Sequence, residues 1–318
     1  MGKRMGIVTR DCAGINAAIR SAVRTAYTLG IEPVGIYREY KGLIHGEFTP
    51  LTWRSVAGII NLGGTILKSA RCEEFRTRQG QEKARAQLAE QRIDSLLVIG
   101  GNGSLTGAHE FSRNFSFPVM GVPATIDNDV NHVEMTIGAD TAVNVALDAL
   151  DKIRDTSTSL ERIFVVEVMG RNCGYIASRV ALAGGCEDVL LPERDFDIDK
   201  MAGEILEGHK KGKISWIVIV AEGKAKASDI AREITQATGL ETREVVLGHI
   251  QRGGKPTAFD RIIAARMAHY AVTRFARGFQ NECVSIQNGE LRSIDLEQAI
   301  QPKDIDAEGY YSLIRLLT

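Results

Sequence analysis

The chain has 318 residues, of which 44% are hydrophobic, and this suffices for the cores of about two domains. Its 39 Lys and Arg residues and 40 Asp and Glu residues leave a net charge of −1, which argues against nucleic acid or an anionic membrane as a partner. The five cysteines lack the spacing of a zinc site or a disulfide framework, and no segment has the hydrophobic length of a signal peptide or a membrane span. We therefore expect a cytoplasmic protein with free thiols.

The first part of the chain has the pattern of a strand, a turn and a helix. The hydrophobic spacing predicts strands at residues 5–9 and 31–37, a helix at 13–29 and a short helix at 53–60 that is ended by glycine. The first turn, residues 9–14, contains only one glycine, so it is a weak candidate for a phosphate loop. Arg20 and Arg24 share one face of the expected helix, which is either solvated or half of an anion site.

Strands and helices also alternate through the rest of the chain. The expected strands are at residues 95–99, 117–122, 163–168 and 216–220, and the expected helices are at residues 80–92, 105–111, 141–154 and 258–277. This alternation predicts mainly parallel sheets with right-handed crossovers and ligand sites at their carboxyl edges. The predicted fold class is therefore α/β.

Residues 123–129 are the most informative stretch. They follow an expected buried strand and carry Asp127 and Asp129 two positions apart. At the carboxyl edge of a sheet, one carboxylate can accept a proton from a substrate hydroxyl while the other holds a cation. The same Asp-Asn-Asp pattern after a proline also fits ordinary turn chemistry, and these seven residues alone do not decide between the two interpretations.

Three further turns place glycines beside polar residues. Residues 100–104 are glycine-rich, residues 169–174 include Arg171, and residues 248–254 include His249 and Arg252. Glycine lets a backbone approach a ligand closely, and arginine suits a phosphate. The glycine-rich turn at residues 100–104, taken alone, is explained equally well by tight-turn geometry. His249 by itself is most simply a loop histidine, and Glu222 a carboxylate at a helix N-terminus.

Taken together, the stretches 63–71, 100–104, 123–129, 168–174 and 248–254 resemble bacterial 6-phosphofructokinases in their order and spacing. The resemblance covers essentially the whole chain. It implies two Rossmann-like, three-layer α/β/α domains with the active site in the cleft between them. The implied nucleotide domain consists of residues 1–138 and 256–303, and the implied sugar-phosphate domain consists of residues 139–255 and 304–318.

The resemblance implies ATP-dependent phosphorylation of fructose 6-phosphate to fructose 1,6-bisphosphate, a reaction of glycolysis. It makes Asp127 the general base for the sugar 1-hydroxyl, Arg171 the residue that stabilises the transferring phosphoryl group, and Thr125 a part of the same cradle. The implied sugar-phosphate site consists of Arg162, Met169, Gly170, Glu222, Arg243, His249 and Arg252. The implied nucleotide site consists of Arg10, Arg71, Cys72, Gly101, Asn102, Gly103, Ser104 and Gly107. Mg²⁺ is the implied cofactor, beside Asn102 and Asp129.

An assembly and a regulatory site are implied as well. Arg162 and Arg243 match residues that the family contributes from an adjoining subunit, so a homo-oligomer, most simply a tetramer, is expected. The implied effector pocket for ADP or phosphoenolpyruvate consists of Arg20, Arg24, Arg154, Glu187, Lys211 and Lys213. Lys211 and Lys213 fit a solvated loop as an alternative.

The nucleotide half departs from the family pattern. The loop at residues 9–14 is shorter than in the family and lacks its glycine pair, so Arg10 stands where a bare backbone would meet phosphates. Asn102 replaces a carboxylate that the family associates with magnesium, which keeps an oxygen but loses the charge. Lys68 occupies a position that is commonly glycine. These changes predict a weakened nucleotide site.

Two alternatives follow from these departures. Pyrophosphate-dependent relatives fill the adenosine side with an acidic residue and a lysine, whereas this chain has the small Gly103 and Ala124, so ATP is not sterically excluded. Arg10 and Lys68 would serve pyrophosphate equally well, which makes a pyrophosphate-dependent enzyme the first alternative. A catalytically silent paralogue that binds sugar phosphate or regulates a partner is the second. A nicotinamide-dependent oxidoreductase is disfavoured because no Gly-x-Gly-x-x-Gly follows the first strand.

Overall fold

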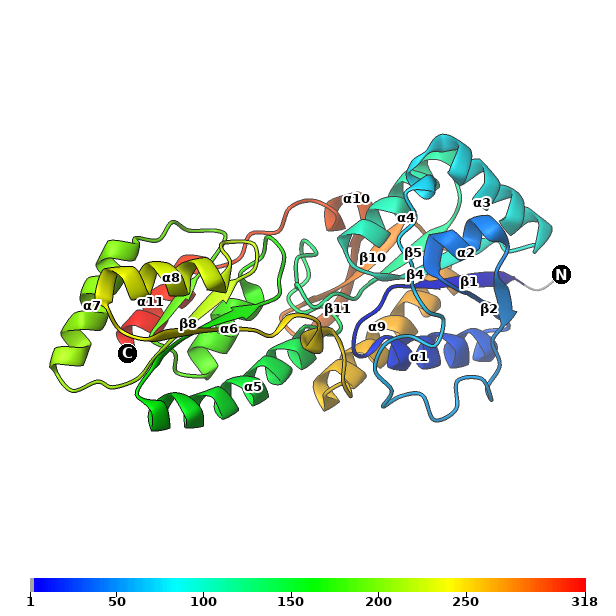
Figure 1. The fold of residues 1–318 in the computed structure, drawn as a ribbon. Coiled ribbons are helices and arrows are strands. Elements are labelled where there is room, and N and C mark those ends of the chain that lie inside the picture. The colour runs from blue at the N-terminus through cyan, green and yellow to red at the C-terminus, as the bar shows by residue number, and fades with distance from the viewer. Residues whose placement is uncertain (1–2) are drawn as a thin grey trace. The chain divides into compact units, whose positions relative to one another are not determined.

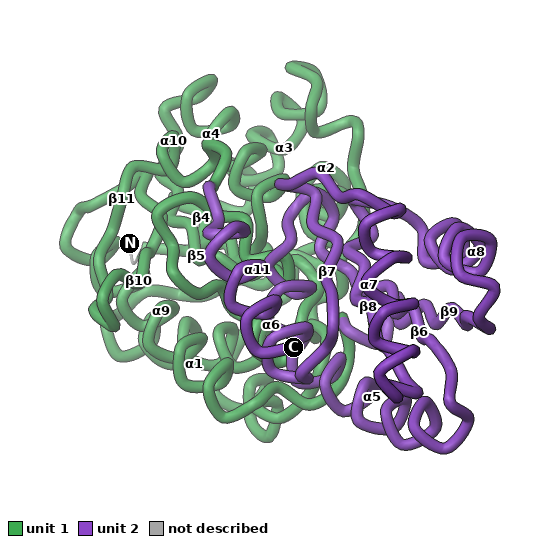
Figure 2. The backbone as a smooth tube through the Cα atoms, turned by 90° about the vertical axis from the view of Figure 1, so that its left-hand side faces the viewer, with its two compact units in different colours: residues 1–141, 252–303 green, residues 142–251, 304–318 purple. Residues whose placement is uncertain are grey.

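The structure is a computed structural model that describes residues 3–318, and the chain divides into two compact units. Unit 1 comprises Met1–Thr141 and Arg252–Lys303, and unit 2 comprises Ala142–Gln251 and Asp304–Thr318. Figure 2 colours the two units separately. Each unit is therefore assembled from segments that are far apart in the sequence.

Unit 1 contains a sheet with helices on both faces (Figure 1). In chain order its described elements are β1 (Arg4–Thr9), α1 (Ile15–Thr28), β2 (Glu32–Ile36), α2 (Glu39–His45), β3 (Phe48–Pro50), η1 (Glu74–Arg76), α3 (Arg78–Glu90), β4 (Ser95–Gly100), α4 (Asn102–Phe115), β5 (Val119–Pro123), the first turn of α5 (Ala139–Leu160), α9 (Ala258–Ala276), β10 (Glu282–Gln287), β11 (Glu290–Asp295) and α10 (Leu296–Ala299). The seven strands have the order β11-β10-β5-β4-β1-β2-β3. All neighbours are parallel except the edge strands β11 and β3.

The layers of unit 1 follow from the hydrophobic pattern. Every residue of β4 is buried, as expected for a parallel strand that is covered on both faces. Helices α1 and α9 lie side by side on one face of the sheet, and α2, α3, α4 and α10 lie on the other (Figures 1 and 2). The buried side chains of α1, from Ile15 to Ala26, recur at helical spacing, so one stripe of this helix packs into the core.

Unit 2 contains a smaller, fully parallel sheet with the order β7-β8-β6-β9. Its described elements are the remainder of α5, β6 (Ile163–Val168), α6 (Tyr175–Ala183), β7 (Asp188–Leu190), α7 (Ile198–Lys210), β8 (Trp216–Ala221), α8 (Ala227–Thr238), β9 (Thr242–Val246), η2 (Gly248–Arg252), whose last residue belongs to unit 1, and α11 (Ala307–Leu316). Alternate residues of β6 and β8, such as Val165 and Val218, form one core with Met201 of α7 and Ile230 of α8. Helices α6 and α11 pack against each other and against β7.

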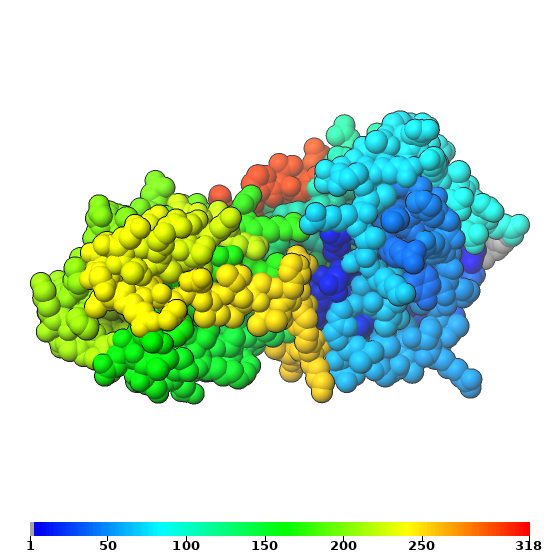
Figure 3. All heavy atoms as spheres, in the orientation of Figure 1, coloured from blue at the N-terminus to red at the C-terminus, as the bar shows by residue number. Residues whose placement is uncertain are grey.

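The α/β fold class with mainly parallel sheets is confirmed, but the helix predicted at residues 53–60 is wrong. That segment consists of turns. Thr52 and Ser55 exchange hydrogen bonds at the start of this segment, as residues at a helix N-terminus do. Gly58 has φ +70°, a left-handed conformation that prevents a helix from continuing. Figure 3 shows the light-blue side chains of this region on the surface of unit 1, and Trp53 is half exposed.

Candidate active site

Three loops meet at the carboxyl edge of the unit 1 sheet, because β1, β4 and β5 are parallel neighbours there. The start of α4, which follows β4, touches the loop that follows β5. Asn102 Nδ2 donates to the backbone oxygen of Asp129 at 3.0 Å. A Cβ atom at Gly101 would lie 3.0 Å from Thr125 Cβ, so the absence of a side chain lets the two loops approach. The structure thus brings Gly101 and Asn102, two predicted nucleotide-binding residues, against the loop that carries Thr125 and Asp127.

The loop that carries Asp127 is held by its own polar side chains. Asn128 has φ +50°, an unusual conformation for a residue other than glycine. Its Oδ1 accepts from Thr136 N at 2.9 Å, and its Nδ2 donates to the backbone oxygen of Glu134 at 3.0 Å. Thr125 Oγ1 accepts from Asp127 N at 3.2 Å, and Asp127 is only 2% exposed. The backbone on both sides of the predicted base is therefore fixed.

Asn102 and Asp129 each provide a side-chain oxygen that is available to bind Mg²⁺. Asn102 Oδ1 and Asp129 Oδ1 are buried, and neither has a hydrogen-bond donor within residues 3–318. A buried oxygen without a partner costs free energy, and such oxygens are the ligands that Mg²⁺ prefers. No group of three His, Cys, Asp or Glu side chains gathers as a metal site in the described part of the chain. The two oxygens therefore fit a Mg²⁺ ion whose other ligands come from outside the protein side chains.

Arg10, in the loop that follows β1, is anchored within unit 1. Its Nη1 donates to Glu39 Oε2 at 2.6 Å and lies 3.5 Å from the backbone oxygen of Ala70. Ser104 Oγ donates to the other carboxylate oxygen of Glu39 at 2.5 Å. Burial raises the pKa of the Glu39 carboxyl, although the guanidinium of Arg10 opposes this effect. The sequence did not single out Glu39, because its two partners are far away along the chain.

The remaining predicted nucleotide residues are Arg71, Cys72 and Gly107. Arg71 is exposed and Cys72 half-buried, both in the segment without regular structure that precedes η1. Gly107 of α4 faces the Tyr40 ring, and a Cβ atom there would lie 3.0 Å from that ring. Tyr40 in turn stacks on Phe75, with 3.9 Å between the ring centroids.

In unit 2, polar residues gather at the carboxyl ends of β6 and β8. Glu222 Oε1 accepts from the backbone nitrogens of Gly170 at 3.2 Å and Arg171 at 2.9 Å. A Cβ atom at residue 223 would lie 1.8 Å from the backbone oxygen of Arg171, so only glycine fits at Gly223. Met169 N donates to Gln251 Oε1 at 2.9 Å. Gln251 is fully buried and was missed by the sequence analysis, although it lies inside the predicted 248–254 turn.

Arg162 and Arg243 do not lie at that edge of the sheet. Arg162 immediately precedes β6, whereas Met169 immediately follows it. Seven residues of extended chain correspond to about 23 Å. Arg162 Nε contacts Glu241 Oε2 at 2.9 Å, and Arg243 Nη2 contacts Glu241 Oε1 at 2.5 Å, so the two arginines share one carboxylate near the amino edge.

His249 and Arg252, the last two predicted sugar-site residues, lie in the short helix η2. His249 is exposed. Arg252 falls on the unit 1 side of the division, where its Nη1 is 3.5 Å from the backbone oxygen of Asp11. Arg252 is thereby placed next to the first loop of unit 1.

Comparisons with known proteins identify the family. Residues 4–275 match the family described as Phosphofructokinase. The chain belongs to the phosphofructokinase family. A protein of Clostridium botulinum (strain Loch Maree / Type A3) named ATP-dependent 6-phosphofructokinase is 48% identical over 308 residues, which cover 97% of this chain and 96% of that protein. A protein of the same name from Halothermothrix orenii is 45% identical, over 99% of both chains.

Solved phosphofructokinase structures share the fold. The phosphofructokinase of Saccharomyces cerevisiae has a TM-score of 0.87 at 32% identity over 94% of this chain. The match covers 45% of the yeast chain, so this chain spans less than half of that relative. A pyrophosphate-dependent phosphofructokinase from Marinobacter aquaeolei has a TM-score of 0.85 at 22% identity, covering 96% of this chain and 86% of its own. At that identity the likeness shows a common phosphofructokinase fold alone.

The predicted effector residues of this phosphofructokinase family member fall in both units. In unit 1, the guanidinium of Arg24 lies over the Trp53 ring, 4.9 Å from its centroid, and Arg20 is half-buried on the same helix. In unit 2, Lys213 Nζ contacts the buried Glu187 at 3.0 Å, and Arg154 Nη2 donates to the backbone oxygen of Gly185 at 2.9 Å. Lys211, by contrast, is exposed and pairs with Glu207 four residues away.

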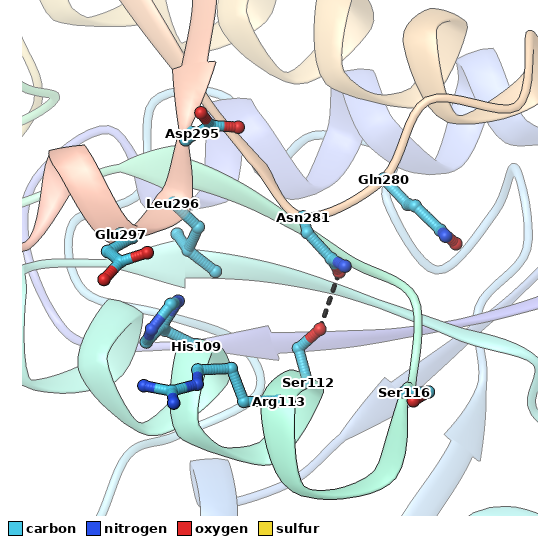
Figure 4. A pocket seen from close by; sticks show the side chains of 9 residues that line it. All are labelled: His109, Ser112, Arg113, Ser116, Gln280, Asn281, Asp295, Leu296 and Glu297. Atoms are coloured by element: carbon cyan, nitrogen blue, oxygen red, sulfur yellow. Dashed lines mark hydrogen bonds between the residues drawn. The ribbon is translucent and has the colours of Figure 1, made fainter.

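A pocket of about 430 Å³ in unit 1 is separate from the predicted site residues of this phosphofructokinase fold, none of which lines it (Figure 4). His109 and Arg113 of α4 stand on one side, and Asp295 and Glu297 on the other. Because charges of both signs line this pocket, it does not favour a nucleotide polyphosphate as its ligand.

The five cysteines all carry free thiols. None of the helices in residues 3–318 has the length and hydrophobicity to span a bilayer.

Proposed function

We propose that the chain is an ATP-dependent 6-phosphofructokinase, which transfers the γ-phosphoryl group of ATP to the 1-hydroxyl of fructose 6-phosphate and forms fructose 1,6-bisphosphate in glycolysis. The observation that carries the proposal is the contact, at one sheet edge, between the Thr125–Asp129 loop and the start of α4 at Gly101 and Asn102. The chain that has this arrangement is 45–48% identical, over nearly its whole length, to proteins named for that activity.

In the proposed reaction Asp127 accepts the proton of the sugar 1-hydroxyl as the oxygen attacks the γ-phosphorus. Phosphoryl transfer depends mostly on positioning and charge stabilisation, so a base fixed by its backbone is well suited to the task. We propose that Arg171 stabilises the charge of the transferring phosphoryl group and that Thr125 belongs to the same phosphoryl-binding site. The backbone nitrogen of Arg171 is held by Glu222, which supports a defined position for this loop.

We propose that Mg²⁺ binds beside Asn102 and Asp129, whose buried oxygens have no donor in the described part of the chain. The ion neutralises phosphate charge when it is bound. Asn102 supplies a neutral oxygen and Asp129 a charged one, so the protein contributes less negative charge than two carboxylates would.

The space beside Gly103 supports a donor as large as ATP. A Cβ atom at Gly103 would meet nothing within 4 Å, so open space adjoins this turn. We propose that Arg10, Arg71, Cys72, Gly101, Ser104 and Gly107 complete the donor site. We place the donor in unit 1 and the sugar phosphate chiefly in unit 2, at Met169, Gly170, Glu222 and His249, together with Arg252.

The position of Arg162 and Arg243 supports an oligomeric enzyme. Because β6 separates Arg162 from Met169, these arginines do not reach the sugar site of their own subunit. A second copy of the chain would supply them, and we propose a homotetramer. We propose a cytoplasmic enzyme, with ADP or phosphoenolpyruvate bound near Arg154, Glu187 and Lys213 as an effector.

A coupled assay that detects fructose 1,6-bisphosphate tests the function. With fructose 6-phosphate and Mg²⁺, we expect turnover with ATP and little with pyrophosphate. Product from pyrophosphate alone would contradict the proposed donor. If neither donor gives product while calorimetry detects tight binding of fructose 6-phosphate, the chain is a sugar-phosphate-binding paralogue instead.

A further inference from the structure

The cluster of Arg10, Glu39 and Ser104 in unit 1 carries a role that the reaction scheme above does not assign. The Glu39 side chain is 4% exposed, and each of its two oxygens accepts a short hydrogen bond from a residue of the proposed donor site. A buried carboxylate is stable only when its oxygens are satisfied in this way. Glu39 therefore restricts the positions of both the Arg10 and the Ser104 side chains.

The backbone at Glu39 has an unusual conformation. Arg38 and Glu39 both have φ +57°, and neither is glycine. Consecutive left-handed residues are costly and persist where the surrounding structure holds them. Tyr40 adds to that hold, because its hydroxyl donates to the backbone oxygen of Ser104 at 2.5 Å while its ring stacks on Phe75. The first turn of α2 is thus attached to the first turn of α4.

Only one nitrogen of the Arg10 guanidinium, Nη1, has hydrogen-bond partners within residues 3–318. Its Nη1 is engaged by Glu39 and lies near Ala70, whereas Nε and Nη2 make no hydrogen bond within residues 3–318. The side chain is 31% exposed. A guanidinium anchored through one nitrogen can present its other donors to a phosphate without losing much conformational freedom on binding.

We propose that Glu39 is a positioning residue for the phosphoryl donor: it orients Arg10 so that the free nitrogens of the guanidinium bind the polyphosphate of a nucleoside triphosphate. This inference rests on the proposed function. In this arrangement Arg10 supplies the donors that the glycine backbone of a longer loop would provide. The hydroxyl hydrogen of Ser104 is given to Glu39, so Ser104 contacts the donor through its backbone nitrogen.

Steady-state kinetics and calorimetry with a non-hydrolysable ATP analogue test the proposal. Glu39→Ala and Arg10→Ala should each raise the KM for ATP by roughly tenfold or more, with the KM for fructose 6-phosphate unchanged and little change in kcat. The double variant should resemble either single variant, because both remove the same contact. Glu39→Gln should recover part of the affinity, since its amide oxygen still accepts from Arg10.

Glu47→Ala is the matched control, because it removes the carboxylate of the nearby Arg38–Glu47 pair without touching Arg10. It should leave both KM values unchanged. An unchanged or lower KM for ATP in Glu39→Ala, or additive effects in the double variant, would overturn the inference. If Glu39→Ala does not fold, the same comparison is made with Glu39→Gln and Arg10→Ala. Absence of ATP turnover in the wild type would refute the proposed function instead, so the two failures are distinct.

Discussion

Asp260 of α9 offers the sharpest test of how unit 1 is held together where α5 begins. Its Oδ1 accepts from Gly138 N at 2.8 Å, and its Oδ2 accepts from Thr141 N at 2.8 Å and from the Thr141 hydroxyl. Thr257 caps the same helix by accepting from Asp260 N. The carboxylate is fully buried, and it joins two segments that are more than a hundred residues apart.

The structure sets the size of the effect. Asp260→Ala removes the acceptor of two buried backbone N–H groups and of the Thr141 hydroxyl. At about 1–3 kcal/mol for each of the two N–H groups alone, we expect a loss of about 2–6 kcal/mol in the free energy of unfolding. In Asp260→Asn, an amide NH₂ group replaces one of the two acceptor oxygens. One hydrogen bond is lost, and we expect the free energy of unfolding to fall by about 1–3 kcal/mol. Burial raises the pKa of Asp260, so removing its charge offsets part of that loss.

Urea unfolding followed by circular dichroism measures these losses, and amide hydrogen exchange at Gly138 and Thr141 locates them. Both amides should exchange faster in the Asp260 variants. Asp295→Asn is the matched control, because Asp295 is exposed and makes no capping hydrogen bond at the start of α10. If Asp260→Ala is within about 0.5 kcal/mol of the wild type, the carboxylate does not hold these segments, and the reasoning is refuted.

Three further predictions concern the active site. Asp127→Ser should lower kcat by about 10²–10⁴-fold while calorimetry still detects fructose 6-phosphate binding; near-normal turnover would exclude Asp127 as the base. Asn102→Asp should lower the Mg²⁺ concentration for half-maximal activity on the order of tenfold, and an unchanged Mg²⁺ titration would remove Asn102 from the metal site. Because burial raises the pKa of Glu39, its stabilising contribution is present below the ordinary glutamate pKa and is lost as pH rises through the folded value. Glu39→Gln should therefore gain stability relative to the wild type as pH rises, and a pH-independent difference in urea unfolding would contradict this.

Local patterns in the sequence predicted β1, β2, β4, β5, β6 and β8 and the helices α1, α3, α4, α5 and α9, but they did not identify α2, α6, α7, α8, α11 or β10. The strand expected at residues 95–99 is β4, and the helix expected at 258–277 is α9, each displaced by a residue or two at most. A buried parallel strand has a continuous hydrophobic run, and a packed helix has hydrophobic residues at a spacing of about 3.6. Both elements can therefore be recognised from a short stretch of sequence. The error at residues 53–60 arose because Gly58 stops a helix that the preceding residues begin.

The sequence by itself determined which loops follow the parallel strands, and hence that Asn102, Thr125 and Asp127 come from one sheet edge. Only the tertiary structure decided that Glu39 anchors Arg10 and that Asp260 ties Gly138 to α9. Each of these contacts joins a carboxylate to donors that belong to other elements. A hydrogen bond of this kind depends on how the elements pack and not on spacing along the chain, so it leaves no periodic pattern to read.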